Sequence, residues 1–118
     1  MRVRRIRPDD SPLLADIFAR FGPASRLARF LYPKRTLTEA ELRYLTDIDH
    51  RDHEALIAVT RLRAEPAGVA RFIRDRSDPT SAEVAIAVVD EWQDRGVGLL
   101  LIARVTGRAL RQHYTAPH

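Results

Sequence analysis

The feature that most constrains the fold is a change in the spacing of apolar residues near residue 54. Before it, apolar residues recur about every four positions, as on one face of a helix. After it come three short apolar runs, over residues 56–59, 68–73 and 84–89. The links over 61–66 and 75–80 are charged, contain proline and are too short for a crossover helix. The sequence therefore predicts three neighbouring antiparallel strands that follow a helical region.

The first half of the chain predicts one strand and two or three helices. Residues 3–7 alternate apolar and basic side chains, which favours a half-buried strand that Pro8 ends. Ser11 is the expected N-cap of a helix that runs to the Gly22-Pro23 stop. A short helix is expected over 25–31. Thr38, followed three residues later by Glu41, predicts a capping box and a further helix.

The last predicted element is a helix over residues 97–111. Its expected inner face consists of Val97, Leu101, Ile102, Val105 and Ala109. Its expected solvated face consists of Arg104, Arg108 and Arg111. The order strand, two or three helices, three-strand antiparallel meander, helix predicts an α+β fold of α/β three-layer-like character. We expect one domain over 1–111 and a disordered tail over 112–118, which is polar and shows no periodicity.

Composition excludes several classes of site. The chain has no cysteine, which excludes disulfides, iron–sulfur clusters and thiol nucleophiles. No stretch approaches the ~20 apolar residues of a membrane helix, and the N-terminus has no signal-peptide pattern, so a cytoplasmic protein is expected. His50 and His53 are three residues apart, but no further ligands converge with them, and no metal site is predicted.

Charge favours a small anionic ligand over nucleic acid. The net charge is +4, yet each half of the chain carries +2, from 11 basic and 9 acidic residues in 1–59 and from 9 and 7 in 60–118. Basic residues are therefore not gathered in one arm, and nucleic acid is not the expected partner. A ligand that carries phosphate groups suits this charge better.

The window over residues 88–98 predicts where that ligand binds. It joins a buried strand to an amphipathic helix through Gly96 and Gly98, which lie where the helix begins. Unpaired N–H groups and the positive end of the helix dipole attract an anion there. A dinucleotide fingerprint needs a third glycine and a parallel sheet, and a Walker loop needs Gly-Lys-Ser/Thr. Neither pattern is present. A tight turn without a ligand is the alternative.

The pattern Gln93-x-x-Gly96-x-Gly98 resembles the cofactor loop of the GNAT acetyltransferases. The resemblance implies that the loop binds the pyrophosphate of acetyl-CoA, and that the end of the preceding strand pairs with the pantetheine arm. The implied pyrophosphate contacts are Gln93, Asp94, Arg95, Gly96, Val97 and Gly98. The implied pantetheine contacts are main-chain groups of Val88 and Val89, and an N–H of either residue would polarise the thioester.

The order of elements is similar to the N-terminal two thirds of the GNAT fold. That family continues with a fifth strand and a further helix, whereas seven residues follow Arg111 here. We therefore expect the C-terminal part of the domain to be missing, with weak coenzyme A binding by the chain alone. An exposed sheet edge would follow, through which a homo-oligomer is one alternative.

Three segments, 25–30, 42–49 and 54–58, resemble bacterial protein-lysine acetyltransferases. This resemblance implies an N-acetyltransferase that moves an acetyl group from acetyl-CoA to a primary amine, with a protein lysine as one acceptor. Glu83, at the start of the fourth strand, is the implied general base, and no metal is implied. A solvated edge position is the alternative for Glu83. A non-catalytic acyl-CoA-binding module and a small basic adaptor are the alternatives for the whole chain.

Overall fold

The computed structural model describes residues 1–20, 37–78 and 80–110. It contains β1 (Arg2–Arg5), α1 (Ser11–Ala19), α3 (Glu39–Thr46), β2 (His53–Val59), β3 (Pro66–Arg74), β4 (Ala82–Val88) and α4 (Val97–Ala109). Two short 3-10 turns, η1 (Pro8–Asp10) and η3 (Asp90–Trp92), precede α1 and α4. The helix expected over 25–31 and the tail over 112–118 lie outside the described residues.

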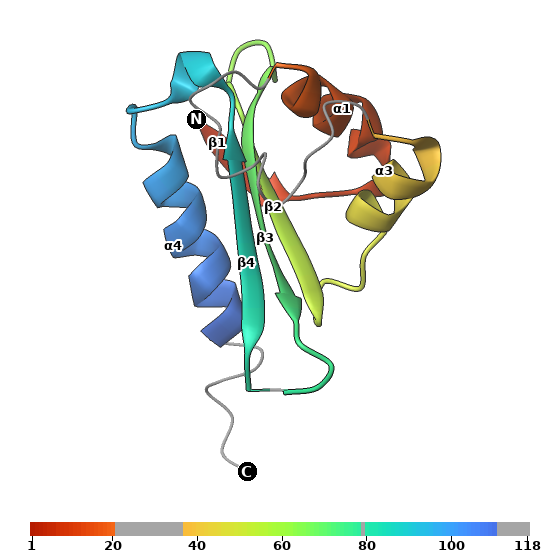
Figure 1. Cartoon of the computed structure of the whole chain (residues 1–118). Coiled ribbons are helices and arrows are strands. Elements are labelled where there is room, and N and C mark those ends of the chain that lie inside the picture. The colour runs from red at the N-terminus through yellow and green to blue at the C-terminus, as the bar shows by residue number, and fades with distance from the viewer. Residues whose placement is uncertain (21–36, 79, 111–118) are drawn as a thin grey trace.

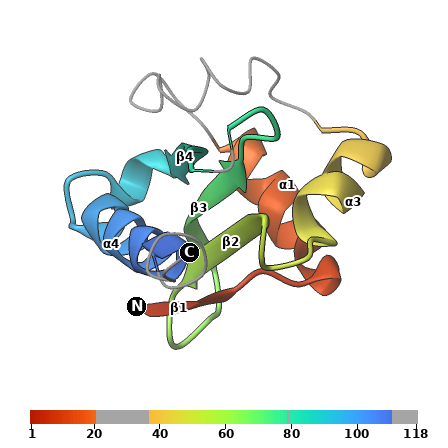
Figure 2. The same cartoon turned by 90° about the horizontal axis from the view of Figure 1, so that it is seen from below.

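The strands form one antiparallel sheet in the order β1-β2-β3-β4. The predicted three-strand meander is therefore confirmed, and β1 adds to it by pairing with β2. Helix α4 covers one face of the sheet, and α1 and α3 cover the other (Figures 1 and 2). The fold is α+β with three layers, and β4 forms one edge of the sheet.

Alternation along the strands divides the interior into two apolar clusters. Side chains that face α1 and α3 include Ala55, Val69 and Ala87, packed with Ile17 and Phe18. Side chains that face α4 are buried in a second cluster, which includes Leu56, Ala58, Ala70, Phe72 and Val88 packed with Leu101 and Val105. Because β2 is buried on both faces along its whole length, its residues 55–59 form a continuous apolar run in the sequence.

The helix starts show where local signals predicted the structure. The Thr38 hydroxyl accepts a hydrogen bond from the Glu41 N–H at 3.1 Å, and the Glu41 carboxylate accepts one from the Thr38 N–H at 2.9 Å. The capping box is confirmed. For α1 the predicted N-cap is wrong by one residue, because Asp10 occupies that position and Ser11 is the first helical residue.

Asp10 also joins the start of α1 to β1. Burial alone would raise the pKa of its carboxyl group, but hydrogen bonds from Arg4 and from the Arg7 N–H outweigh burial and hold that pKa below its usual range. The Arg4 guanidinium donates to both carboxylate oxygens, at 2.7 and 2.8 Å. This bidentate pair fixes the angle at which the chain leaves the sheet.

The predicted inner face of α4 needs one correction. Val97, Leu101, Val105 and Ala109 are buried, as expected, but the Ile102 side chain is 40% exposed. The buried residues recur every four positions, and Ile102 lies about 100° around the helix from Leu101. No helix within the described ranges is both long and apolar enough to cross a membrane.

Candidate functional site

The helix that follows β4 begins without a side-chain cap. Gly96 is its N-cap residue, with a left-handed φ of 84°, and no side chain accepts a hydrogen bond there. Leu100 is the first residue of α4 whose N–H bonds back, to the Gly96 carbonyl at 3.0 Å. In the described part of the chain, the N–H groups of Val97, Gly98 and Leu99 have no backbone acceptor. Three donors and the helix dipole are therefore available to an anion.

The two glycines of the loop have different structural roles. A Cβ added at Gly96 would meet nothing within 4 Å, but the positive φ at this position disfavours every residue with a side chain. A Cβ at Gly98 would make ordinary contacts, 3.6 Å from Ile86 and 3.7 Å from Val88. The backbone conformation therefore requires glycine at 96 and tolerates alanine at 98.

Gln93 and Trp92 attach the loop to the rest of the domain. The Gln93 side-chain amide donates to the Val88 carbonyl at 3.0 Å, and the Gln93 N–H donates to the Asp90 carbonyl at 3.1 Å. Trp92 packs against both apolar clusters, and the Arg95 guanidinium lies 5.2 Å from its ring centroid. Gln93 thus makes one hydrogen bond with its side chain and one with its main chain, both to groups of the protein. These bonds hold the loop next to the end of β4.

Strand β4 directs alternate main-chain groups toward the outer edge of the sheet. The Val89 N–H donates to the Ala67 carbonyl at 2.9 Å, so Val89 is bonded toward β3. In an antiparallel pair, every second residue bonds to the same neighbour. Main-chain groups of Val84, Ile86 and Val88 therefore face the outer edge, where the described residues supply no fifth strand.

Glu83 lies at the opposite end of β4 from the loop. Its side chain is exposed, and its cross-strand neighbour is Ile73, which in turn neighbours His53. The three side chains lie in one row on the sheet face that α1 and α3 cover. Val88 lies five positions after Glu83, which corresponds to about 17 Å of extended strand. The predicted base and the predicted anion site are thus joined by one strand but are not in contact.

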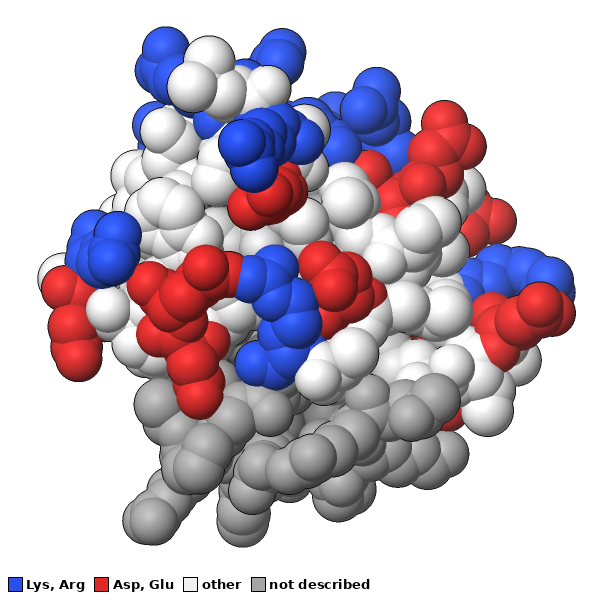
Figure 3. Space-filling view, turned by 90° about the horizontal axis from the view of Figure 1, so that it is seen from above, with Lys and Arg blue, Asp and Glu red and all other residues white. Residues whose placement is uncertain are grey.

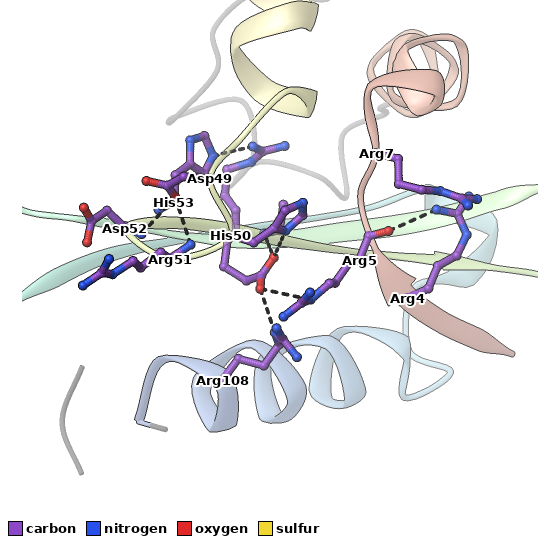
Figure 4. A network of polar contacts seen from close by, with 12 residues as sticks. Arg4, Arg5, Arg7, Asp49, His50, Arg51, Asp52, His53 and Arg108 are labelled. Atoms are coloured by element: carbon purple, nitrogen blue, oxygen red, sulfur yellow. Dashed lines mark hydrogen bonds and ion pairs between the residues drawn. The ribbon is translucent and has the colours of Figure 1, made fainter. Parts of the chain in front are cut away.

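The structure contains a buried polar cluster around Glu54 that the sequence did not predict. Glu54 is fully buried and accepts hydrogen bonds from Arg108 Nε at 2.8 Å and from the Ala55 N–H at 3.0 Å, and His50 Nδ1 lies 2.5 Å from it. The Arg5 Nε lies 3.6 Å away (Figure 4). The predicted solvated face of α4 is therefore wrong at Arg108, because this side chain reaches the sheet. Arg104 is exposed, as expected, and Arg111 lies outside the described residues.

His53 points to the other face of the sheet, away from Glu54. Its Nε2 lies 2.8 Å from the Arg71 guanidinium, which also donates to the Leu45 carbonyl at 3.0 Å. Burial, reinforced by the charge of Arg71, lowers the pKa of His53 to about 4. His50 and His53 thus have separate partners. No group of three or more metal-ligating side chains occurs within the described ranges.

Charge is mixed at the end of the molecule that carries the loop. Viewed from that end, acidic and basic side chains are interspersed on the part of the surface that the structure describes (Figure 3). Among the residues that the structure describes, this face shows no continuous basic area of the kind that follows a nucleic-acid backbone. The donors that the start of α4 offers to an anion are therefore main-chain N–H groups.

Comparison with known proteins gives a consistent result. The model of the family described as Acetyltransferase (GNAT) matches residues 16–116. Acetyltransferase Pat of Mycolicibacterium smegmatis is 34% identical over 85 residues, which cover 69% of this chain and 26% of that protein. The crystal structure of the GNAT domain of S. lividans PAT superposes with a TM-score of 0.79 at 26% identity, and covers 95% of this chain and 66% of that one.

A third similarity concerns the fold alone. The aminoglycoside 6'-N-acetyltransferase whose crystal structure was solved with coenzyme A has a TM-score of 0.58 at 18% identity, over 92% of this chain and 57% of that one. The chain thus spans about a quarter of the curated relative and about two thirds or less of the two solved chains.

Proposed function

Because the chain belongs to the GNAT acetyltransferase family, we propose that it transfers an acetyl group from acetyl-CoA to a primary amine. The family carries out acyl transfer from acyl-CoA to amines. The observation that carries the proposal for this chain is the uncapped start of α4, where the N–H groups of Val97, Gly98 and Leu99 have no backbone acceptor within the described residues. A diphosphate supplies the acceptors that such a helix end lacks.

The residues around the loop fit the coenzyme. The diphosphate binds the main chain over 94–98, and Gln93 with Arg95 keeps the loop in place through Val88 and Trp92. The thioester arm runs along the outer edge of β4, where strand alternation directs the main-chain groups of Val88 and Ile86. An arm of this kind is needed because the loop and Glu83 are about 17 Å apart along the strand.

Glu83 is the proposed general base. The carboxylate removes a proton from the ammonium group of the acceptor, and the free amine then attacks the thioester carbonyl. The new C–N bond forms as the C–S bond breaks, and the coenzyme leaves as a thiolate that takes up a proton. Glu83 is exposed at the start of β4, so its carboxylate is accessible to an incoming amine.

Main-chain polarisation of the thioester is proposed for an N–H of β4 that faces the outer edge and lies between Val88 and Glu83, that of Ile86. Val88 and Val89, the two residues that the resemblance implied, fit this role less well, because Val88 lies about 17 Å from Glu83 along the strand and the Val89 N–H donates to Ala67 inside the sheet. An N–H that points to the developing oxyanion lowers the barrier to acyl transfer. The direct reaction in a ternary complex uses no covalent enzyme intermediate.

A protein lysine is the proposed acceptor. Support comes from the similarity to acetyltransferase Pat and to the GNAT domain of S. lividans PAT, the two relatives with the highest identity given above. The alternative is a module that binds acyl-CoA without transferring the acyl group. Both proposals share the loop and differ only in whether Glu83 acts.

Substitution of Glu83 separates these two functions. We expect Glu83→Gln to lower acetyl transfer to a lysine peptide by about 10²–10⁴-fold, because general base catalysis typically contributes that much. Acetyl-CoA affinity, measured by calorimetry, should stay unchanged. Glu65→Gln is the matched control, since Glu65 is an exposed glutamate in the β2–β3 turn. Absence of transfer by the unaltered chain, with acetyl-CoA bound, would favour the non-catalytic module.

A further inference from the structure

A hollow of about 550 Å³ lies outside the proposed coenzyme site. It lies where α3 ends, β2 begins and β3 ends, and its apolar part consists of Tyr44, Ile48 and Ile73. The Tyr44 side chain is 61% exposed, and its ring centroid lies 5.5 Å from that of His53. An exposed aromatic ring next to a cavity is a surface that attracts cations as well as apolar groups.

The hollow is acidic within a basic protein. Its charged lining consists of Asp47, Asp49, Asp52, Asp75, Arg74 and Arg76, four carboxylates and two guanidinium groups, and thus a net charge of −2. His53 is also part of the lining and is neutral at pH 7, because burial and Arg71 lower its pKa to about 4. The whole chain has a net charge of +4. The local sign is therefore opposite to the global one, which favours a cationic ligand here.

Three of these four carboxylates have partners within the described residues, and one has none there. Asp49 accepts hydrogen bonds from three main-chain N–H groups, Asp52 pairs with Arg74 at 3.2 Å, and Asp75 accepts from Ser77. Asp47 is exposed, and within the described residues its carboxylate has no hydrogen-bond or ion-pair partner. It is the group best placed to pair with a positive charge from outside the protein.

The hollow is continuous with the row that carries the proposed base. His53 and Ile73 line it, and Ile73 is the cross-strand neighbour of Glu83 on the same face of the sheet. Two strand spacings separate His53 from Glu83, about 10 Å. An extended polypeptide advances about 3.3 Å per residue, so this distance corresponds to about three residues.

We propose that this hollow binds a basic side chain of the acceptor polypeptide, an arginine or lysine about three residues from the lysine that is acetylated. The proposal rests on the proposed function and adds a substrate class to it, namely lysines with a basic neighbour at that spacing. Tyr44 and Ile73 contact the aliphatic part of this side chain, and Asp47 pairs with its charge. A guanidinium group suits the site because it stacks on an aromatic ring and pairs with a carboxylate at once.

The test compares peptides that differ at one position. Each fluorescent peptide has one lysine, with arginine, alanine or glutamate three residues before or after it, and binding to the 118-residue chain is measured by anisotropy. We expect the arginine peptide of one orientation to bind about two- to fivefold more tightly than the alanine peptide, and the glutamate peptide most weakly. The preference should decrease as ionic strength rises.

Two protein variants assign the effect to the hollow. Asp47→Asn should abolish the arginine preference, whereas Asp9→Asn, the same change at an exposed aspartate outside the hollow, should preserve it. Equal binding of the arginine and alanine peptides, or an equal loss in both variants, would overturn the proposal. If the chain transfers acetyl groups but shows no arginine preference, only the proposal that the hollow binds a basic side chain is refuted. If binding depends on arginine but no acetyl transfer occurs, the proposed role of the hollow is supported and the proposed acetyltransferase activity is refuted.

Discussion

At the residue scale, the two glycines of the loop have different roles. Backbone conformation decides which residue fits at position 96, and side-chain contacts decide it at position 98. Both were predicted from their spacing to Gln93, but only the structure shows that they differ. Gly96 has a φ of 84°, whereas Gly98 lies in the first turn of α4. The first therefore depends on backbone freedom, and the second only on the space beside Ile86 and Val88.

Alanine substitutions at the two glycines should have opposite effects. We expect Gly96→Ala to cost about 1–2 kcal/mol of unfolding free energy, because an L-residue is strained at positive φ. Acetyl-CoA affinity should fall with it, since the three main-chain donors directly follow this residue. Gly98→Ala should keep both properties and add up to about 1 kcal/mol from helix propensity. Urea unfolding and calorimetric titration measure the two quantities, and equal losses in both variants would contradict this assignment.

His53 gives the folded state a defined dependence on pH. Its pKa is about 4 in the folded chain and 6.5 ordinarily, so below pH 6.5 the unfolded chain binds a proton that the folded chain does not. The contribution of His53 is therefore complete above pH 6.5 and is lost as the pH falls toward 4, by about 1.4 kcal/mol per pH unit at most.

A series of urea titrations from pH 7.5 to pH 4 tests this sign. The decline in unfolding free energy should be less steep in His53→Gln, which has no ionisable ring. His50→Gln is the comparison, because His50 is partly exposed and pairs with Glu54. A decline of the same slope in His53→Gln and in the unaltered chain would show that His53 is not the group responsible.

At the element scale, α4 is held to the sheet by a buried ion pair as well as by apolar packing. Helical spacing predicted its buried residues apart from Ile102. Helical spacing could not predict that Arg108 contacts buried Glu54. A row of arginines at i, i+4 and i+7 has the same pattern whether that face is solvated or covers a buried acid. The apolar context of Glu54 at the start of β2 was the available signal for a buried acid.

The two arginines of α4 offer a matched comparison. Arg108→Met removes the 2.8 Å contact to fully buried Glu54, and we expect a loss of about 2–3 kcal/mol in unfolding free energy. Arg104→Met, at an exposed position of the same helix, should change it by less than about 0.5 kcal/mol. Thermal or urea unfolding followed by circular dichroism measures both. Similar small effects would mean that Glu54 is satisfied without Arg108.

At the scale of the whole molecule, the outer edge of β4 links the two ends of the proposed site. The meander and its order were predictable, because the links between strands are too short for any other connection. Which main-chain groups of β4 face outward was not predictable, since it depends on the register with β3 and on the Val89 to Ala67 hydrogen bond.

Amide hydrogen exchange should report this alternation. We expect the N–H groups of Ala85 and Ala87, bonded toward β3, to exchange slowly, and those of Val84 and Ile86, directed to the outer edge, to exchange quickly. Saturating acetyl-CoA should slow exchange at Ile86 and over 96–98. Equal protection of all four β4 amides without ligand would show that another segment covers the edge.

The sequence by itself determined the local elements and the family. Apolar periodicity, the Thr38–Glu41 capping box and the Gln93-x-x-Gly96-x-Gly98 pattern depend on neighbours within a few residues, so they are visible in the chain. Tertiary structure alone decided which polar groups are buried together, as for Glu54 with Arg108, and where the acidic hollow lies relative to Glu83. These pairings join residues far apart in the chain, and only the register of the sheet and the packing of helices on it bring them into contact.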